Sequence, residues 1–110
     1  NFLQKLDEVF LLLEIHPLMY SPENSFYNTL TNLFENKFNV LYVESAGKPI
    51  PIEFKKEGYV PFKVQNNRGL YKNISKDFLL SFATKNTQDY IDESNLSLKQ
   101  IRSILLHKKK

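Results

Sequence analysis

The sequence contains no cysteine and only three glycines among its 110 residues. The lack of cysteine excludes disulfide bonds, zinc sites with Cys ligands and cysteine nucleophiles. Gly47, Gly58 and Gly69 are isolated from one another, so no glycine-rich loop is present to cradle a phosphate chain. A G-x-S-x-G stretch, which would place a serine nucleophile on a strand-to-helix turn, is also missing. These absences remove several classes of enzyme.

Long apolar runs are absent as well. Apolar runs such as Val9–Leu13 and Phe78–Leu80 fall far below the roughly 20 apolar residues that span a bilayer. No basic segment precedes an apolar stretch with a small-residue cleavage site, so we expect no signal peptide. The two histidines, His16 and His107, are too isolated to predict a metal site. We therefore expect no cofactor, no membrane partner, and an intracellular location in the cytoplasm or nucleus.

Charge is distributed unevenly along the chain. Residues 1–36 carry one basic and five acidic residues, whereas residues 37–74 carry seven basic and three acidic ones. Residues 75–110 carry seven basic and four acidic residues, and the whole chain has a formal net charge of +3. A basic later part favours an anionic partner for one face. A surface with charges of both signs, whose role is solubility alone, explains a net charge of +3 equally well.

The hydrophobic content is sufficient for a core. Hydrophobic residues make up 42% of the chain and aromatic residues 14%, which is typical of a folded domain rather than a disordered chain. A chain of 110 residues has the length of one domain. We predict a single α+β domain over residues 1–110.

Two helices are predicted in the N-terminal third. Apolar residues recur at helical spacing over residues 2–15, and His16 before Pro17 ends this helix because a residue preceding proline is pushed out of the helical region. The second helix is expected over residues 21–36. Ser21 can cap it, and Pro22 suits the first helical position.

Strand signals follow in the middle of the chain. Short stretches rich in β-branched and aromatic residues predict strands at about residues 38–43, 49–55 and 59–64, with a short fourth strand from Leu70. Pro49 and Pro51 lack N–H groups, so the strand 49–55 is expected at a sheet edge. If residues 59–64 form a strand, Tyr59 and Lys63 point outward and Phe62 points into the core.

Two helices are predicted at the C-terminal end, over about residues 75–84 and 97–108. Ser75 can cap the first, and residues 97–100 read Ser-Leu-Lys-Gln, a capping box, at the start of the second. The fold class is therefore α+β, with a small antiparallel meander of three to four strands, two N-terminal helices and two C-terminal helices.

Residues 39–56, NVLYVESAGKPIPIEFKK, resemble the core of the PD-(D/E)xK nuclease superfamily, in which a strand and a glycine turn precede Glu-x-Lys. The resemblance implies that Glu44 and Glu53 hold a divalent metal and that Lys55 positions the attacking water. On a strand, Glu53 and Lys55 would share one face. Asn39 stands where the family has an upstream Asp. Glu8, in the predicted first helix, would replace the acid that the family carries on a helix. Two solvent-facing charges on a half-exposed strand explain Glu53 and Lys55 as well.

Basic residues alternate with aromatic ones in the middle of the chain and recur near its end. A sheet that presents rings among bases can stack nucleobases and hold phosphates. Core aromatic residues beside solvated lysines, and a packed terminal helix with a solvated tail, give the same pattern. The candidate nucleic-acid-binding residues are Lys55, Lys56, Tyr59, Lys63, Arg68, Lys72, Lys99, Arg102 and Lys108.

We interpret the chain as a small basic, non-enzymatic binding module associated with nucleic acid, which contacts phosphates through its basic middle and C-terminal portions. The first alternative is a protein-protein interaction domain that uses the N-terminal helices or the edge strand 49–55. The second is the metal-dependent nuclease, with Glu44, Glu53 and Lys55 as its catalytic residues.

Overall fold

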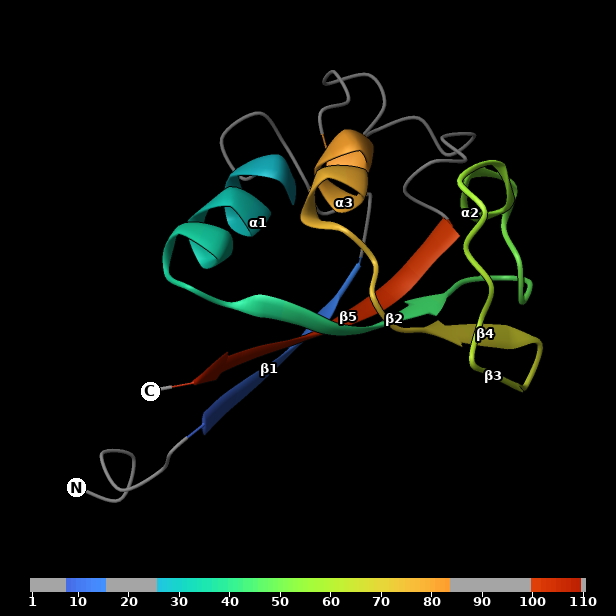
Figure 1. Ribbon diagram of the computed structural model, residues 1–110, viewed down its shortest axis with the longest axis horizontal. Helices are drawn as coiled ribbons and strands as arrows, with labels where there is room; N and C mark the ends of the chain where they lie inside the picture. The colour runs from blue at the N-terminus through green and yellow to red at the C-terminus, as the bar shows by residue number, and fades with distance from the viewer. Residues whose placement is uncertain (1–7, 16–25, 84–99, 110) are drawn as a thin grey trace.

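The computed structural model of the protein contains a five-stranded antiparallel sheet with helices packed on one of its faces (Figure 1). The structure describes residues 8–15, 26–83 and 100–109. The strands follow one another across the sheet in the order β1-β5-β2-β4-β3. Their bounds are β1 Glu8–Glu14, β2 Asn39–Ser45, β3 Lys63–Gln65, β4 Arg68–Tyr71 and β5 Ile101–Lys109, and the described helices are α1 Phe26–Glu35, α2 Ile52–Lys56 and α3 Lys76–Ala83. The predicted α+β class is confirmed.

Two segments predicted as helices are strands. Residues 8–14 of the predicted helix 2–15 form β1, and residues 101–108 of the predicted helix 97–108 belong to β5. The two strands pair in unbroken register from Glu8 opposite Lys109 to Glu14 opposite Ser103. The prediction was wrong because a short apolar run carries no periodicity that separates strand from helix. Residues 2–7 and 97–99 of the predicted helices lie outside the described residues.

The predicted edge strand 49–55 is also wrong. Pro51 is extended, with φ −63° and ψ 157°, and the helix α2 begins directly after it. The two prolines of this segment cannot donate to a sheet ladder, whereas a fixed φ near −65° suits the chain just before a helix. Phe54, the central residue of α2, is fully buried, so the short helix is held by its contact with the core.

The predicted meander of three to four strands is wrong, because the sheet has five described strands and β5 lies between β1 and β2. The predicted start of the second helix, with Ser21 and Pro22, lies outside the described residues.

Other predicted elements overlap the observed ones. The predicted strand 38–43 is β2, the helix 21–36 contains α1, and the helix 75–84 is α3, where the Ser75 hydroxyl accepts the Phe78 N–H at 3.0 Å. Of the predicted strand 59–64, only its end belongs to β3. β3 and β4 form a hairpin closed by Asn66 and Asn67, with φ of 53° and 62°, as a turn of type I′ requires.

The ends of α1 and α2 share one capping geometry. The N–H groups of Gly58 and Tyr59 donate to carbonyls of the last turn of α2, both at 3.0 Å. The N–H groups of Lys37 and Phe38 do the same at the end of α1, at 3.0 and 3.1 Å. This is the Schellman motif, whose first residue outside the helix is left-handed. Gly58 has φ 80°, and Lys37 has φ 69° without the freedom of glycine.

The core lies between the helices and one face of the sheet. Its sheet side is made of Val43, Ile104 and Leu106, all with no exposed area. Its helix side includes the fully buried Phe26, Leu30, Phe54 and Leu79. Figure 1 shows α1 and α3 above this face, with the β3–β4 hairpin extending to one side. No described helix is long and apolar enough to cross a membrane.

Candidate functional site

The face of the sheet opposite the described helices is called the open face here. Strand residues alternate between the two faces of a sheet. Val43 and Ser45 of β2 are buried toward the helices, so Tyr42 and Glu44 point to the open face. Gly69 and Tyr71 of β4 are buried likewise, so Arg68 and Leu70 also lie on the open face.

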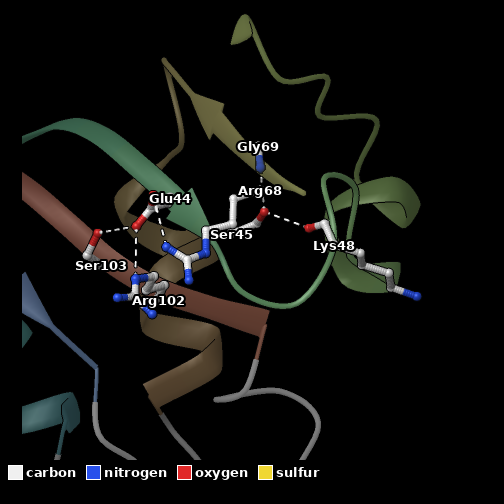
Figure 2. Close-up of polar contacts among 7 residues, drawn as sticks. All are labelled: Glu44, Ser45, Lys48, Arg68, Gly69, Arg102 and Ser103. Carbon is white, nitrogen blue, oxygen red and sulfur yellow. Dashed lines mark hydrogen bonds and ion pairs between the residues drawn. The ribbon is translucent and has the colours of Figure 1, made fainter. Parts of the chain in front are cut away.

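Glu44 is the centre of a polar cluster on the open face. Figure 2 shows its carboxylate between the side chains of Arg68 on β4 and Arg102 on β5. The Arg102 Nε lies 3.4 Å from one carboxylate oxygen of Glu44, and an Arg68 terminal nitrogen lies 4.0 Å from the other. The Ser103 hydroxyl donates to Glu44 at 3.3 Å. These are the two arginines of the chain, brought together from positions 34 residues apart.

A β-bulge places Arg102 in this cluster. Glu44 lies opposite Ser103 and Ser45 lies opposite Ile101, so Arg102 is an extra residue in β5. A bulge bends its strand and changes the direction of a side chain. The Arg102 backbone remains fixed, because its carbonyl accepts the N–H of Ile15 at 2.9 Å. Half of the Arg102 side chain, 52%, stays exposed.

Ser45 fixes the position of Arg68. The buried Ser45 hydroxyl accepts the Gly69 N–H at 2.8 Å and donates to the Lys48 carbonyl at 2.7 Å, as drawn in Figure 2. This bridge holds β4 beside β2 one residue away from Arg68. Position 69 has no room for a side chain, because an added Cβ would meet the Pro49 carbonyl oxygen. Hydrogen bonds within the sheet therefore fix the backbone next to Arg68 and at Arg102.

Two aromatic rings lie next to the arginine cluster. Phe62 packs on Tyr42 with ring centroids 5.5 Å apart and planes inclined by 40°. The Phe62 N–H donates to the Leu70 carbonyl at 2.8 Å, which ties the residue to β4. Phe62 is nevertheless 47% exposed. The Lys72 ammonium lies 4.5 Å from the Phe62 ring centroid, a cation-π contact.

Charged residues of both signs lie on the open face. Lys63 lies opposite Leu70 in the β3–β4 ladder and so belongs to this face. Lys63, Arg68, Lys72 and Arg102 form what we call the basic half of the open face, with Glu44 as the acid among them. The β1 side carries Glu8 and Glu14 instead. Glu8 lies 3.5 Å from His107, whose ring also contacts Phe10 with centroids 5.1 Å apart.

The structure thus places four of the predicted nucleic-acid-binding residues on the open face and four others, Lys55, Lys56, Tyr59 and Lys108, away from them. Lys55 and Lys56 lie on α2, away from the open face, with Lys56 3.5 Å from Glu53. Lys99 lies outside the described residues. Lys108 borders a different hollow of about 410 Å³, which it shares with Lys37 and Lys109.

The predicted roles of Tyr59 and Phe62 are reversed. The Tyr59 ring packs against Phe54 and Phe78, with centroid distances of 6.3 and 4.9 Å, and its hydroxyl accepts the Ser75 N–H at 3.3 Å. Phe62, expected in the core, is exposed. The inversion follows from the short extent of β3, because residues 59–62 are not strand and do not alternate between two faces.

The residues implied by the nuclease resemblance are not assembled. Glu44 lies on the open face, whereas Glu53 and Lys55 lie on α2, on the helix side of the sheet. Residues two apart on a helix do not face the same way, so the shared face expected for Glu53 and Lys55 is lost. Among the residues that the structure describes, no group of three His, Asp or Glu side chains could hold a metal ion.

Tyr42, Phe62, Glu44 and Ser103 are the residues of the cluster that sequence reasoning did not assign to nucleic acid. Alternation with a buried neighbour could have placed Tyr42 and Glu44 together, since both flank Val43 on β2. No pattern in the sequence predicts the β-bulge that places Arg102 and Ser103 next to Glu44. Comparisons with protein-family models, with curated proteins and with solved structures found no match.

Proposed function

We propose that this protein binds nucleic acid through the basic half of the open face. The observation that carries the proposal is the convergence of four cations, Lys63, Arg68, Lys72 and Arg102, on a surface that also presents the exposed Phe62 ring. Phosphates supply the affinity of nucleic-acid complexes, and aromatic rings on a sheet supply stacking surfaces for bases. Both elements occur here side by side.

The arginine geometry supports phosphate binding. A guanidinium group has five N–H donors in a planar fork, and the contact with Glu44 occupies only part of each fork. Arg68 and Arg102 keep 36% and 52% of their side chains exposed. Glu44 limits the rotamers of both arginines before any ligand arrives, which lowers the entropy that binding must remove. The free donors can then make charge-assisted hydrogen bonds to phosphate oxygens.

Salt-dependent binding tests the proposal. Neutralising four phosphates predicts that affinity falls by about a hundredfold between 50 and 200 mM salt. Arg68→Gln combined with Arg102→Gln should remove about half of the salt slope, since two of the four cations are lost. Lys55→Gln combined with Lys56→Gln on α2 is the matched control, and it should leave affinity near the wild-type value. No binding to DNA or RNA at low salt would overturn the proposal.

A protein partner that adds a strand to β1 is the second candidate function. Within the described residues β1 is paired with β5 alone and ends the sheet. Phe10 and Leu12 on β1 are 56% and 58% exposed, and an exposed apolar edge is a template for strand pairing. If the partner is a second copy, native mass measurement should give a species heavier than 13.0 kDa. Leu12→Lys should return that species to the monomer.

A further inference from the structure

We infer that the nucleic acid taken by the open face is single-stranded, with an unpaired base stacked at Phe62 and the neighbouring phosphates on Arg68 and Arg102. The inference rests on the proposed function and adds the class of ligand. Two kinds of group lie on this surface: cations, which bind the phosphates of any nucleic acid, and an exposed ring, on which an accessible base face can stack.

The exposed ring is the first argument. Phe62 is 47% exposed although it is anchored by its backbone N–H to Leu70 and by its ring to Tyr42. In an undistorted duplex the base faces are covered by their stacked neighbours, and a ring reaches one only by unstacking and kinking a base step, which costs free energy. In a single strand each base offers a π-face regardless of sequence. The fixed position of Phe62 therefore favours an unpaired base.

Lys72 gives the second argument. Its ammonium lies 4.5 Å from the Phe62 ring centroid, and the residue is exposed at the end of β4. A base that stacks on Phe62 replaces this cation-π contact, and the long Lys72 side chain can then move to the phosphate of the same nucleotide. The cation and the ring together thus match the two parts of one nucleotide.

The position of the arginines gives the third argument. Arg68 and Arg102 lie on β4 and β5, on either side of the β2 residue Glu44. Tyr42 lies on the same face of β2, two residues from Glu44. The carboxylate that both arginines contact and the ring that Phe62 contacts therefore lie on the same face of one strand, β2. An extended nucleic-acid backbone can cross the strands on this face, with phosphates at the arginines and a base at the rings.

Binding of matched oligonucleotides tests the inference. The probes are fluorescent single strands of DNA and RNA of about 12 nucleotides, within the range covered by sheet-based single-strand modules, and a DNA duplex of the same length. Fluorescence anisotropy at low salt should show at least about tenfold tighter binding of one or both single strands than of the duplex. Equal or tighter binding of the duplex overturns the inference while the proposed function stands. Failure of all three probes to bind overturns both.

Variants at Phe62 separate stacking from electrostatic binding. Phe62→Leu keeps an apolar side chain on Tyr42 but removes the π-face, and it should weaken single-strand binding by about fivefold or more with no effect on duplex binding. Arg68→Gln should weaken binding of both kinds of probe. Val64→Leu, an exposed position of β3 opposite Gly69, is the matched control and should change neither. Unchanged single-strand affinity in a folded Phe62→Leu variant would contradict the stacking role.

Discussion

The Glu44 carboxylate on β2 lies 3.4 Å from the Arg102 Nε on β5, across a ladder in which Arg102 has no opposite residue. The same carboxylate contacts Arg68 from the other neighbouring strand at 4.0 Å. Glu44 thus orients two cations and also competes with any anion that approaches them. Its removal separates these two effects.

Glu44→Gln should therefore tighten nucleic-acid binding. The amide keeps the size of the side chain but removes the negative charge, and an exposed ion pair of this kind is worth up to about 1 kcal/mol, or about fivefold in affinity. The free energy of unfolding should change by less than about 1 kcal/mol for the same reason. Glu53→Gln, which removes a carboxylate from α2, is the control and should leave affinity unchanged. Weaker binding by Glu44→Gln would show that orientation of the arginines outweighs competition.

Ser45→Ala should destabilise the fold. The hydroxyl is fully buried and joins the Gly69 N–H to the Lys48 carbonyl, so its removal leaves a buried donor and a partly buried acceptor without their partner. We expect the free energy of unfolding to fall by about 2 kcal/mol. Urea unfolding measures it. Ser81→Ala, at an exposed hydroxyl of α3 that donates to the Phe78 carbonyl, should change stability by less than about 0.5 kcal/mol.

Lys37→Gly should stabilise the protein. Lys37 ends α1 with φ 69°, the geometry that Gly58 adopts at the end of α2 with φ 80°. A non-glycine residue in this region is strained, and we expect relief of about 1 kcal/mol. Asn73→Gly is the control, since Asn73 has φ 59° but asparagine tolerates this region well. An equal gain in the free energy of unfolding for Lys37→Gly and Asn73→Gly would show that the strain of lysine at a positive φ is not the cause.

Tyr71 should make stability fall at high pH. Burial raises the pKa of the Tyr71 hydroxyl above its usual value of 10.0. The unfolded chain then loses this proton at lower pH than the folded chain does. The contribution of Tyr71 is therefore complete below about pH 10 and decreases as pH rises above it.

The variant Tyr71→Phe isolates this contribution. It removes the titrating group together with the hydrogen bond that the hydroxyl donates to the Pro49 carbonyl. Wild type should be the more stable protein near pH 8, and the difference should shrink as the pH rises above about 10. Denaturant unfolding across this range measures the difference. A constant difference would show that Tyr71 ionises equally in both states.

Local signals in the sequence predicted the elements that depend on local chemistry. Ser75 caps α3 as expected, and the break expected between the strand 59–64 and the strand from Leu70 is the β3–β4 turn at Asn66 and Asn67. The strand β2 was visible from its β-branched and aromatic residues. Each of these elements is specified by its own residues.

The elements that failed depend on distant partners. β1 and β5 were both predicted as helices from their apolar residues, and each is a strand because the other pairs with it across 89 to 101 positions of sequence. A helix was even favoured locally at the start of the C-terminal segment by the capping-box pattern of Ser97 and Gln100. Tertiary pairing overrides such local preferences.

The candidate site was half predictable for the same reason. Charge alone selected four residues of the open face: Lys63, Arg68, Lys72 and Arg102. The same pattern also included Lys55 and Lys56, which lie on α2, and Tyr59, which packs against the core. Only the order of strands across the sheet shows that Arg68 and Arg102 flank Glu44. That order cannot be derived from the spacing of the residues along the chain.

Amide chemical-shift mapping with a single-stranded oligonucleotide tests the central claim most directly. Binding through the open face predicts that the largest shifts fall at residues 42–44, 62–72 and 102–103, and that α2 and the hollow at Lys37 and Lys108 remain unchanged. Shifts concentrated at Lys55, Lys56 or Lys108, or no shifts at low salt, would contradict it.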